Sequence, residues 1–152
     1  MNDFIRGSSS YTRNELHVCF KVKYCHKVFD FVEIKKRCEE IFREVAENLR
    51  VIIEEIGFDS DHVHMDIVIR STQSISGVAK KFKGTSGWKL LREFPLLKKK
   101  FFWGSGFWGE QIFADSVGKE HTTIRTYVRN QGANRKSHLL NIFIEDGILL
   151  SF

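Results

Sequence analysis

The chain has 152 residues, 42% of them apolar and 28% charged, which is enough to build one domain around a buried core and excludes a disordered tail. Lysine and arginine number 24 against 19 aspartates and glutamates, so the net charge of 24 − 19 = +5 favours a polyanionic partner. The sequence has no apolar run of about 18 residues and no secretory leader, and its cysteines form no C-x-x-C pair, so we expect neither a membrane protein nor a secreted one.

The first predicted element is a strand over residues 16–24, where apolar and polar residues alternate. Residues 1–14 before it are expected to be a mobile lead-in, because residues 7–14 are polar and show no period. The apolar face of the strand carries Leu16, Val18, Phe20, Val22 and Tyr24, and its other face carries His17, Cys19, Lys21 and Lys23.

A long amphipathic helix is predicted over residues 31–49, with Asp30 as its N-cap. Two further strands follow at residues 51–58 and 62–70, and the short polar link between them predicts an antiparallel hairpin. On the second of these strands His62, His64 and Asp66 share the face opposite to the apolar residues.

The second half of the chain begins with a helix that Ser74 is expected to cap, although Gly84 and Gly87 weaken its continuation before Pro95 ends it. A strand over residues 108–116 and a helix over residues 120–131 complete the series, and the apolar tail at 133–152 packs as a strand or a helix. The order of elements predicts a ferredoxin-like α+β sandwich, in which two helices back one antiparallel sheet and an extra C-terminal helix is added.

Such a sheet has one face that the two helices leave uncovered. We expect this open face to carry polar side chains of the first and third strands, namely His17, Lys21, Lys23, His62 and His64.

The basic charge is concentrated in one segment of the chain. Residues 80–103 carry eight positive and one negative side chain, a net charge of +7, whereas residues 31–59 carry five and eight, a net charge of −3. Within the basic segment Lys98, Lys99 and Lys100 precede a run of aromatic residues, which suits phosphates beside stacked bases. A solvated lysine run beside ordinary core aromatics explains the same pattern equally well.

Two pairs of residues carry the candidate chemistry. His62 and His64 lie two apart on a strand, so both imidazoles leave the same face and can hold one cation, although a histidine on an exposed sheet face needs no ligand. Tyr127 and Gln131 lie four apart on the last predicted helix, as a candidate nucleophile and a candidate third ligand. By spacing alone, a core aromatic packed beside Ile124 and Val128 explains Tyr127 better than a nucleophile does.

Five segments, in this order, resemble a known family: residues 17–29, Asp61-His62-Val63-His64, Phe82-Lys83-Gly84-Thr85-Ser86, residues 107–118 and residues 124–131. They are similar to the single-tyrosine transposases of the smallest bacterial and archaeal insertion sequences, the IS200-like members of the HUH endonuclease superfamily. The resemblance covers roughly residues 15–132, and we expect residues 1–152 to form a single domain of this kind.

The resemblance implies that His62, His64 and Gln131 bind Mg²⁺ or Mn²⁺. Tyr127 would attack single-stranded DNA and leave a 5′-phosphotyrosine and a free 3′-OH. Members of the family recognise hairpins at the element ends in the bacterial or archaeal cytoplasm. They act as homodimers in which the tyrosine helix of one subunit can complete the histidine site of the other.

Basic side chains from several elements are expected to contact the DNA. They are Lys21, Lys23, Lys80, Lys81, Lys83, Lys98, Lys99, Lys100, Arg125 and Arg129.

Three other functions stay open. A ferredoxin-like module could hold single-stranded RNA or DNA without chemistry, and a domesticated relative could process chromosomal repeats with the same residues. A metal-dependent hydrolase would use the two histidines but would leave Tyr127 unexplained. A zinc cluster of His17, Cys19, Cys25 and His26 is disfavoured, because Cys25 and His26 fall on opposite sides of the strand end.

Overall fold

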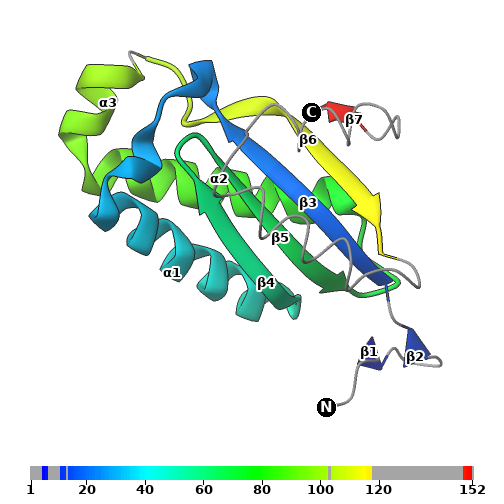
Figure 1. Ribbon diagram of the computed structural model, residues 1–152. Helices are drawn as coiled ribbons and strands as arrows, with labels where there is room; N and C mark the ends of the chain where they lie inside the picture. The colour runs from blue at the N-terminus through cyan, green and yellow to red at the C-terminus, as the bar shows by residue number, and fades with distance from the viewer. Residues whose placement is uncertain (1–4, 7–10, 13, 103, 118–148, 152) are drawn as a thin grey trace.

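An antiparallel sheet with two long helices on one face forms the centre of the computed structural model, which describes residues 5–6, 11–12, 14–102, 104–117 and 149–151 (Figure 1). Its strands are β3 (Asn14–Val22), β4 (Ile52–Asp59), β5 (His62–Ile69), β6 (Trp108–Ser116) and the short β7 (Leu149–Ser151). The order across the sheet is β4-β5-β3-β6-β7, and every neighbouring pair is antiparallel.

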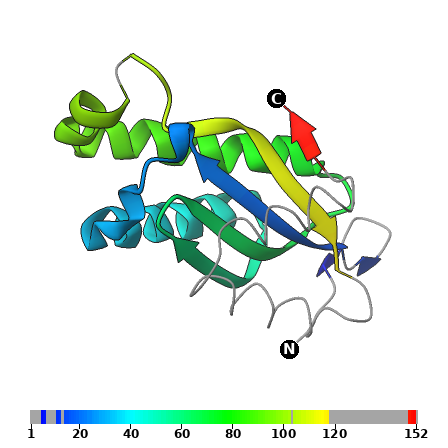
Figure 2. The same cartoon turned by 45° about the horizontal axis from the view of Figure 1, so that its top comes forward.

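The helices are α1 (Val32–Leu49), α2 (Ile75–Glu93) and α3 (Pro95–Phe101). Figures 1 and 2 show α1 and α2 side by side on the same face of the sheet. With two strand-helix-strand halves and β3 and β5 as inner strands, the arrangement is the predicted ferredoxin-like sandwich.

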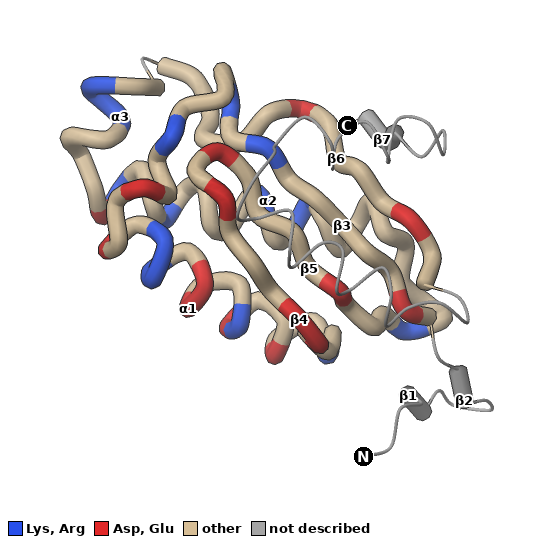
Figure 3. Tube along the Cα trace, in the orientation of Figure 1, with Lys and Arg blue, Asp and Glu red and all other residues tan. Residues whose placement is uncertain are grey.

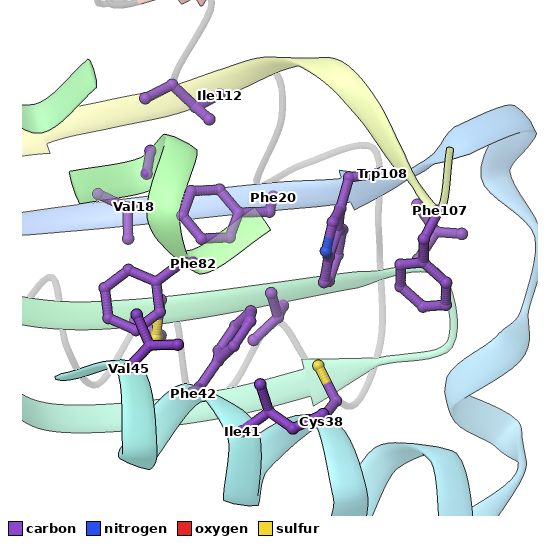
Figure 4. Packing of buried hydrophobic residues seen from close by; sticks show 14 of the residues in the cluster. Val18, Phe20, Cys38, Ile41, Phe42, Val45, Phe82, Phe107, Trp108 and Ile112 are labelled. Carbon is purple, nitrogen blue, oxygen red and sulfur yellow. The ribbon is translucent and has the colours of Figure 1, made fainter. Parts of the chain in front are cut away.

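Aromatic rings fill the space between the sheet and the helices (Figure 4). Phe20 of β3 contacts Phe42 of α1 at 6.1 Å between ring centroids, and Phe42 contacts Phe82 of α2 at 5.2 Å. Trp108 closes the cluster, and its indole Nε1 donates a 2.8 Å hydrogen bond to Ser86 Oγ, which itself donates to the Phe82 carbonyl at 2.6 Å. The buried indole N–H is therefore satisfied, as a polar group inside a core must be.

One expectation about a helix boundary is wrong. Asp30 does not cap α1: its carboxylate accepts a 2.5 Å hydrogen bond from Ser60 Oγ, and Phe31 occupies the N-cap position without a side-chain bond. The helix capped by Ser74 continues through both glycines to Glu93, because Gly87 packs directly against β6, where an added Cβ would lie 3.4 Å from Phe107 Cβ. Packing offsets the low helix propensity of glycine here.

Pro95 ends α2 but also begins α3, at the first position of a helix, where its missing N–H costs nothing.

The first strand differs from its predicted limits. It begins at Asn14 and ends at Val22, because Tyr24 and Cys25 both have positive φ and turn the chain out of the sheet. Tyr24 is consequently 68% exposed and is not a core residue. Before β3, the strands β1 (Ile5–Arg6) and β2 (Tyr11–Thr12) form a short antiparallel pair within the segment that was expected to be a mobile lead-in.

The predicted helix at 120–131 lies outside the described residues, as does the tail from 133 up to β7. Within the described part of the chain, no helix is both long and apolar enough to cross a membrane.

Candidate active site

The face of the sheet away from α1 and α2 carries the polar residues of β3 and β5, and it is not open as predicted. His17 and His62 are each 2% exposed and His64 is 7% exposed, whereas Lys21 and Lys23 are partly exposed at the end of β3. Since β3 and β5 are inner strands, each histidine has neighbours on both sides, which alternation along one strand does not reveal.

His62 stands at the first position of β5, directly after a tight turn. That turn is fixed by backbone hydrogen bonds from other elements: Val22 N donates to the Asp61 carbonyl at 2.8 Å, and Phe29 N donates to the Ser60 carbonyl at 3.0 Å. The Asp61 carboxylate accepts a 2.9 Å hydrogen bond from His62 Nδ1 in a buried position. This bond keeps the proton on Nδ1 and leaves the Nε2 lone pair available to a cation.

His64 lies two residues further along the same face, opposite Cys19 of β3 and Gly57 of β4. A Cβ at position 57 would lie 2.8 Å from His64 Nε2 and closer still to Cε1, so the imidazole occupies the space that a side chain would need. Burial, with smaller contributions from His62 and His17, lowers the pKa of His64 to about 4. The ring is therefore neutral at pH 7, which is the form that binds metals.

The two rings suit a divalent cation. Their centroids lie 6.2 Å apart, and neutral imidazole nitrogens together with oxygen ligands fit ions such as Mn²⁺. Among the described residues, no three His, Cys, Asp or Glu side chains are grouped to hold a metal, so the pair needs a ligand from elsewhere. Gln131, predicted as that ligand, and the predicted nucleophile Tyr127 lie outside the described residues, as do Arg125 and Arg129.

The residues weighed as a zinc cluster are separated. Cys19 is buried beside the histidine pair, and burial raises the pKa of its thiol to about 12, so it stays protonated. Cys25 is exposed, and His26 packs against Phe101 at 4.9 Å between ring centroids.

The predicted DNA-binding lysines fall in three places among the described elements. Lys21 and Lys23 lie at the end of β3, Lys80, Lys81 and Lys83 lie on α2, and Lys98, Lys99 and Lys100 are exposed on α3. Acidic residues, by contrast, line β4 (Figure 3). The aromatic residues expected to stack on bases are partly core: Phe102, Phe107 and Trp108 are buried.

Three features were not predicted from the sequence: the hydrogen bond between His62 and Asp61, the space that Gly57 leaves for His64, and the exposure of Trp88. The first two could have been found, since a hairpin with a two-residue turn places Gly57 opposite His64 and Asp61 beside His62. Nothing in the local sequence distinguishes Trp88 from a core tryptophan.

The structure is that of a ferredoxin-like α+β protein, with a buried histidine pair on the face of its antiparallel sheet away from the helices. The chain belongs to the IS200-like transposase family, whose family model matches residues 10–131.

Curated relatives agree with this assignment. The transposase of insertion sequence IS200 from Salmonella typhimurium is 31% identical over 115 residues, which cover 76% of this chain and 74% of that protein. The ISDra2 transposase of Deinococcus radiodurans is 30% identical over 120 residues, covering 77% and 83%.

Solved structures share the fold. A crystal structure of a Deinococcus radiodurans protein assigned as a transposase matches with a TM-score of 0.69 and 24% identity, covering 84% of this chain and 97% of that one. A REP-associated tyrosine transposase bound to a REP hairpin matches with a TM-score of 0.56 and 9% identity, covering 82% and 68%.

Proposed function

We propose that this transposase is a metal-dependent enzyme of the HUH type, which cleaves and rejoins single-stranded DNA at insertion-sequence ends through a 5′-phosphotyrosine on Tyr127. The observation that carries the proposal is the buried His62–His64 pair, in which Asp61 hydrogen-bonds to His62 and burial keeps His64 neutral, in a member of the IS200-like family. The similar fold of a tyrosine transposase bound to a REP hairpin supports hairpin-bearing ends as the substrate.

In this mechanism the Tyr127 oxygen attacks the scissile phosphorus as the bond from phosphorus to the 3′-oxygen breaks. The phenol loses its proton and the leaving 3′-oxygen gains one, so the products are a 5′-phosphotyrosine and a free 3′-OH. Because the phosphodiester energy is kept in the phosphotyrosine, the reverse attack by a 3′-OH rejoins DNA without a nucleotide cofactor.

The protein's contribution at the histidine site is to present two nitrogen lone pairs at fixed positions. Asp61 holds the proton of His62 on Nδ1, and burial keeps His64 unprotonated. Bound Mg²⁺ or Mn²⁺, held by His62, His64 and Gln131, would polarise the scissile phosphate.

The proposal includes a cytoplasmic homodimer in which the tyrosine helix of one subunit completes the histidine site of the other. Mixing two inactive variants, Tyr127→Phe and His64→Asn, tests this arrangement. Activity that returns on mixing supports completion in trans, and activity that stays absent while both variants dimerise contradicts it.

The central experiment incubates the protein with Mn²⁺ or Mg²⁺ and single-stranded DNA from the flanks of its gene, followed by a denaturing gel. We expect a covalent protein–DNA adduct that EDTA and Tyr127→Phe both abolish. Tyr24→Phe is the matched control, because Tyr24 is an exposed tyrosine that the mechanism does not use. If DNA binds well but no adduct forms with either metal, the protein is a binding module.

A further inference from the structure

A groove of about 480 Å³ runs between residues 80–91 of α2 and the start of β6. On α2 it is lined by Lys80, Gly84 and Trp88, spaced four residues apart, and by Lys83, Gly87 and Leu91 in the adjacent row, so one face of the helix lines it. The volume is within the range of small-ligand sites. The groove lies on the helix side of the sheet, whereas the histidine pair lies on the other side.

The glycines of α2 keep this groove open. Gly87 forms its floor, since an added Cβ would touch Phe107 and Trp108. At Gly84 an added Cβ would meet nothing within 4 Å, so the missing side chain leaves free space at the wall.

Trp88 is a stacking surface at the edge of the groove. It is 61% exposed, unlike the buried Trp108, and the guanidinium of Arg92 packs on its ring at 4.9 Å from the centroid. Arg92 thereby holds the indole in one orientation, which lowers the entropy cost of stacking another flat group on it.

The two lysines supply positive charge beside that ring. Lys80 is exposed at the rim, and Lys83, one turn further, is half-buried. Burial lowers the pKa of Lys83 to about 8, and the opposing influence of Glu110 does not restore it. A half-buried ammonium group gains more from an anionic ligand than a fully hydrated one does.

We propose that this groove binds one unpaired nucleotide of single-stranded DNA, with its base stacked on Trp88 and its phosphate between Lys80 and Lys83. Two cations, one carboxylate and an exposed indole favour a flat, anionic ligand over an apolar peptide. The inference rests on the proposed function in one respect: the strand bound is the DNA that the enzyme cleaves.

The test measures binding of a fluorescent ten-nucleotide thymidine strand by anisotropy, in EDTA so that no cleavage occurs. Stacking on one aromatic residue is worth about 1–3 kcal/mol, so Trp88→Ala should weaken binding by about 5- to 150-fold. Trp88→Phe should retain most of the affinity, and Gly84→Leu, which fills the groove, should weaken binding without loss of the fold. Leu96→Ala, at another exposed apolar residue, is the matched control and should bind as the wild type does.

Wild-type affinity in both Trp88→Ala and Gly84→Leu would overturn the inference. So would an equal effect of Trp88→Ala on a duplex of the same length, because a paired base has no free face to offer. The adduct assay is run in parallel. If binding depends on Trp88 but the wild type forms no adduct, the proposed reaction is refuted, and the groove is still supported as a DNA-binding site.

Discussion

Gly57→Ala is the sharpest test of how the histidine pair is built. The new Cβ would lie 2.8 Å from His64 Nε2 and closer still to Cε1. Nonbonded carbon atoms settle at about 3.5–4.0 Å, so the imidazole, whose Cε1 is the nearest atom, must retreat by more than about 1 Å. A displacement of that size at a catalytic site costs about 10²-fold in rate, and overpacking costs about 1–3 kcal/mol of stability.

The assay is the initial rate of adduct formation on flank DNA at saturating Mn²⁺, with folding checked by urea denaturation. Gly77→Ala is the matched control, since its Cβ would lie 3.1 Å from the Ser74 hydroxyl and would meet no other atom within 4 Å, a contact that a small shift relieves. A folded Gly57→Ala protein that cleaves within twofold of the wild-type rate would show that His64 does not need its present position.

Three further predictions concern buried polar groups. Asp61→Ala should lower the affinity for Mn²⁺ by about 10- to 100-fold, because His62 loses the partner that fixes its tautomer; unchanged affinity in a calorimetric titration would refute this role. In EDTA, the wild type should lose up to about 3 kcal/mol of unfolding free energy relative to His64→Asn as the pH falls from 6.5 to 4. The reason is that the unfolded histidine takes up its proton near pH 6.5 and the folded one only near pH 4. Parallel urea curves of the two proteins at each pH measure the difference in unfolding free energy, and a difference that stays constant contradicts the prediction. Ser86→Ala should cost about 1–3 kcal/mol by leaving Trp108 Nε1 without its acceptor, whereas Thr85→Ala, at the partly exposed neighbouring position, should cost little in the same measurement.

Local periodicity was sufficient to predict the strands β3, β4, β5 and β6 of the sheet, but not β7. Val18 and Phe20 on one face, and His17 and Cys19 on the other, indicate a strand without knowledge of its neighbours, and the short link before His62 indicates the hairpin. The sandwich followed from the order of these elements.

Features that depend on distant residues were not predictable in this way. Asp30 was expected to cap a helix but bonds to Ser60, thirty residues later in the chain. The burial of His62 and His64 depends on neighbours on both adjacent strands, whereas alternation identifies only the face on which a residue lies. Trp88 and Trp108 look alike in sequence, and only the packing of α2 on β6 exposes one and buries the other.

The central position of β3 has a consequence for how the protein is made. Leu16 of β3 pairs with Ser116 of β6, 100 residues later, while the other edge of β3 pairs with β5. A ribosome that adds about 5–20 residues per second therefore needs about 5–20 s to supply the partner of the second edge. During that time the strand can pair with the same strand of a neighbouring nascent chain. Rapid synthesis through α2 and α3 would therefore shorten the time during which that edge of β3 is unpaired, and ribosome pausing in that segment would lengthen it.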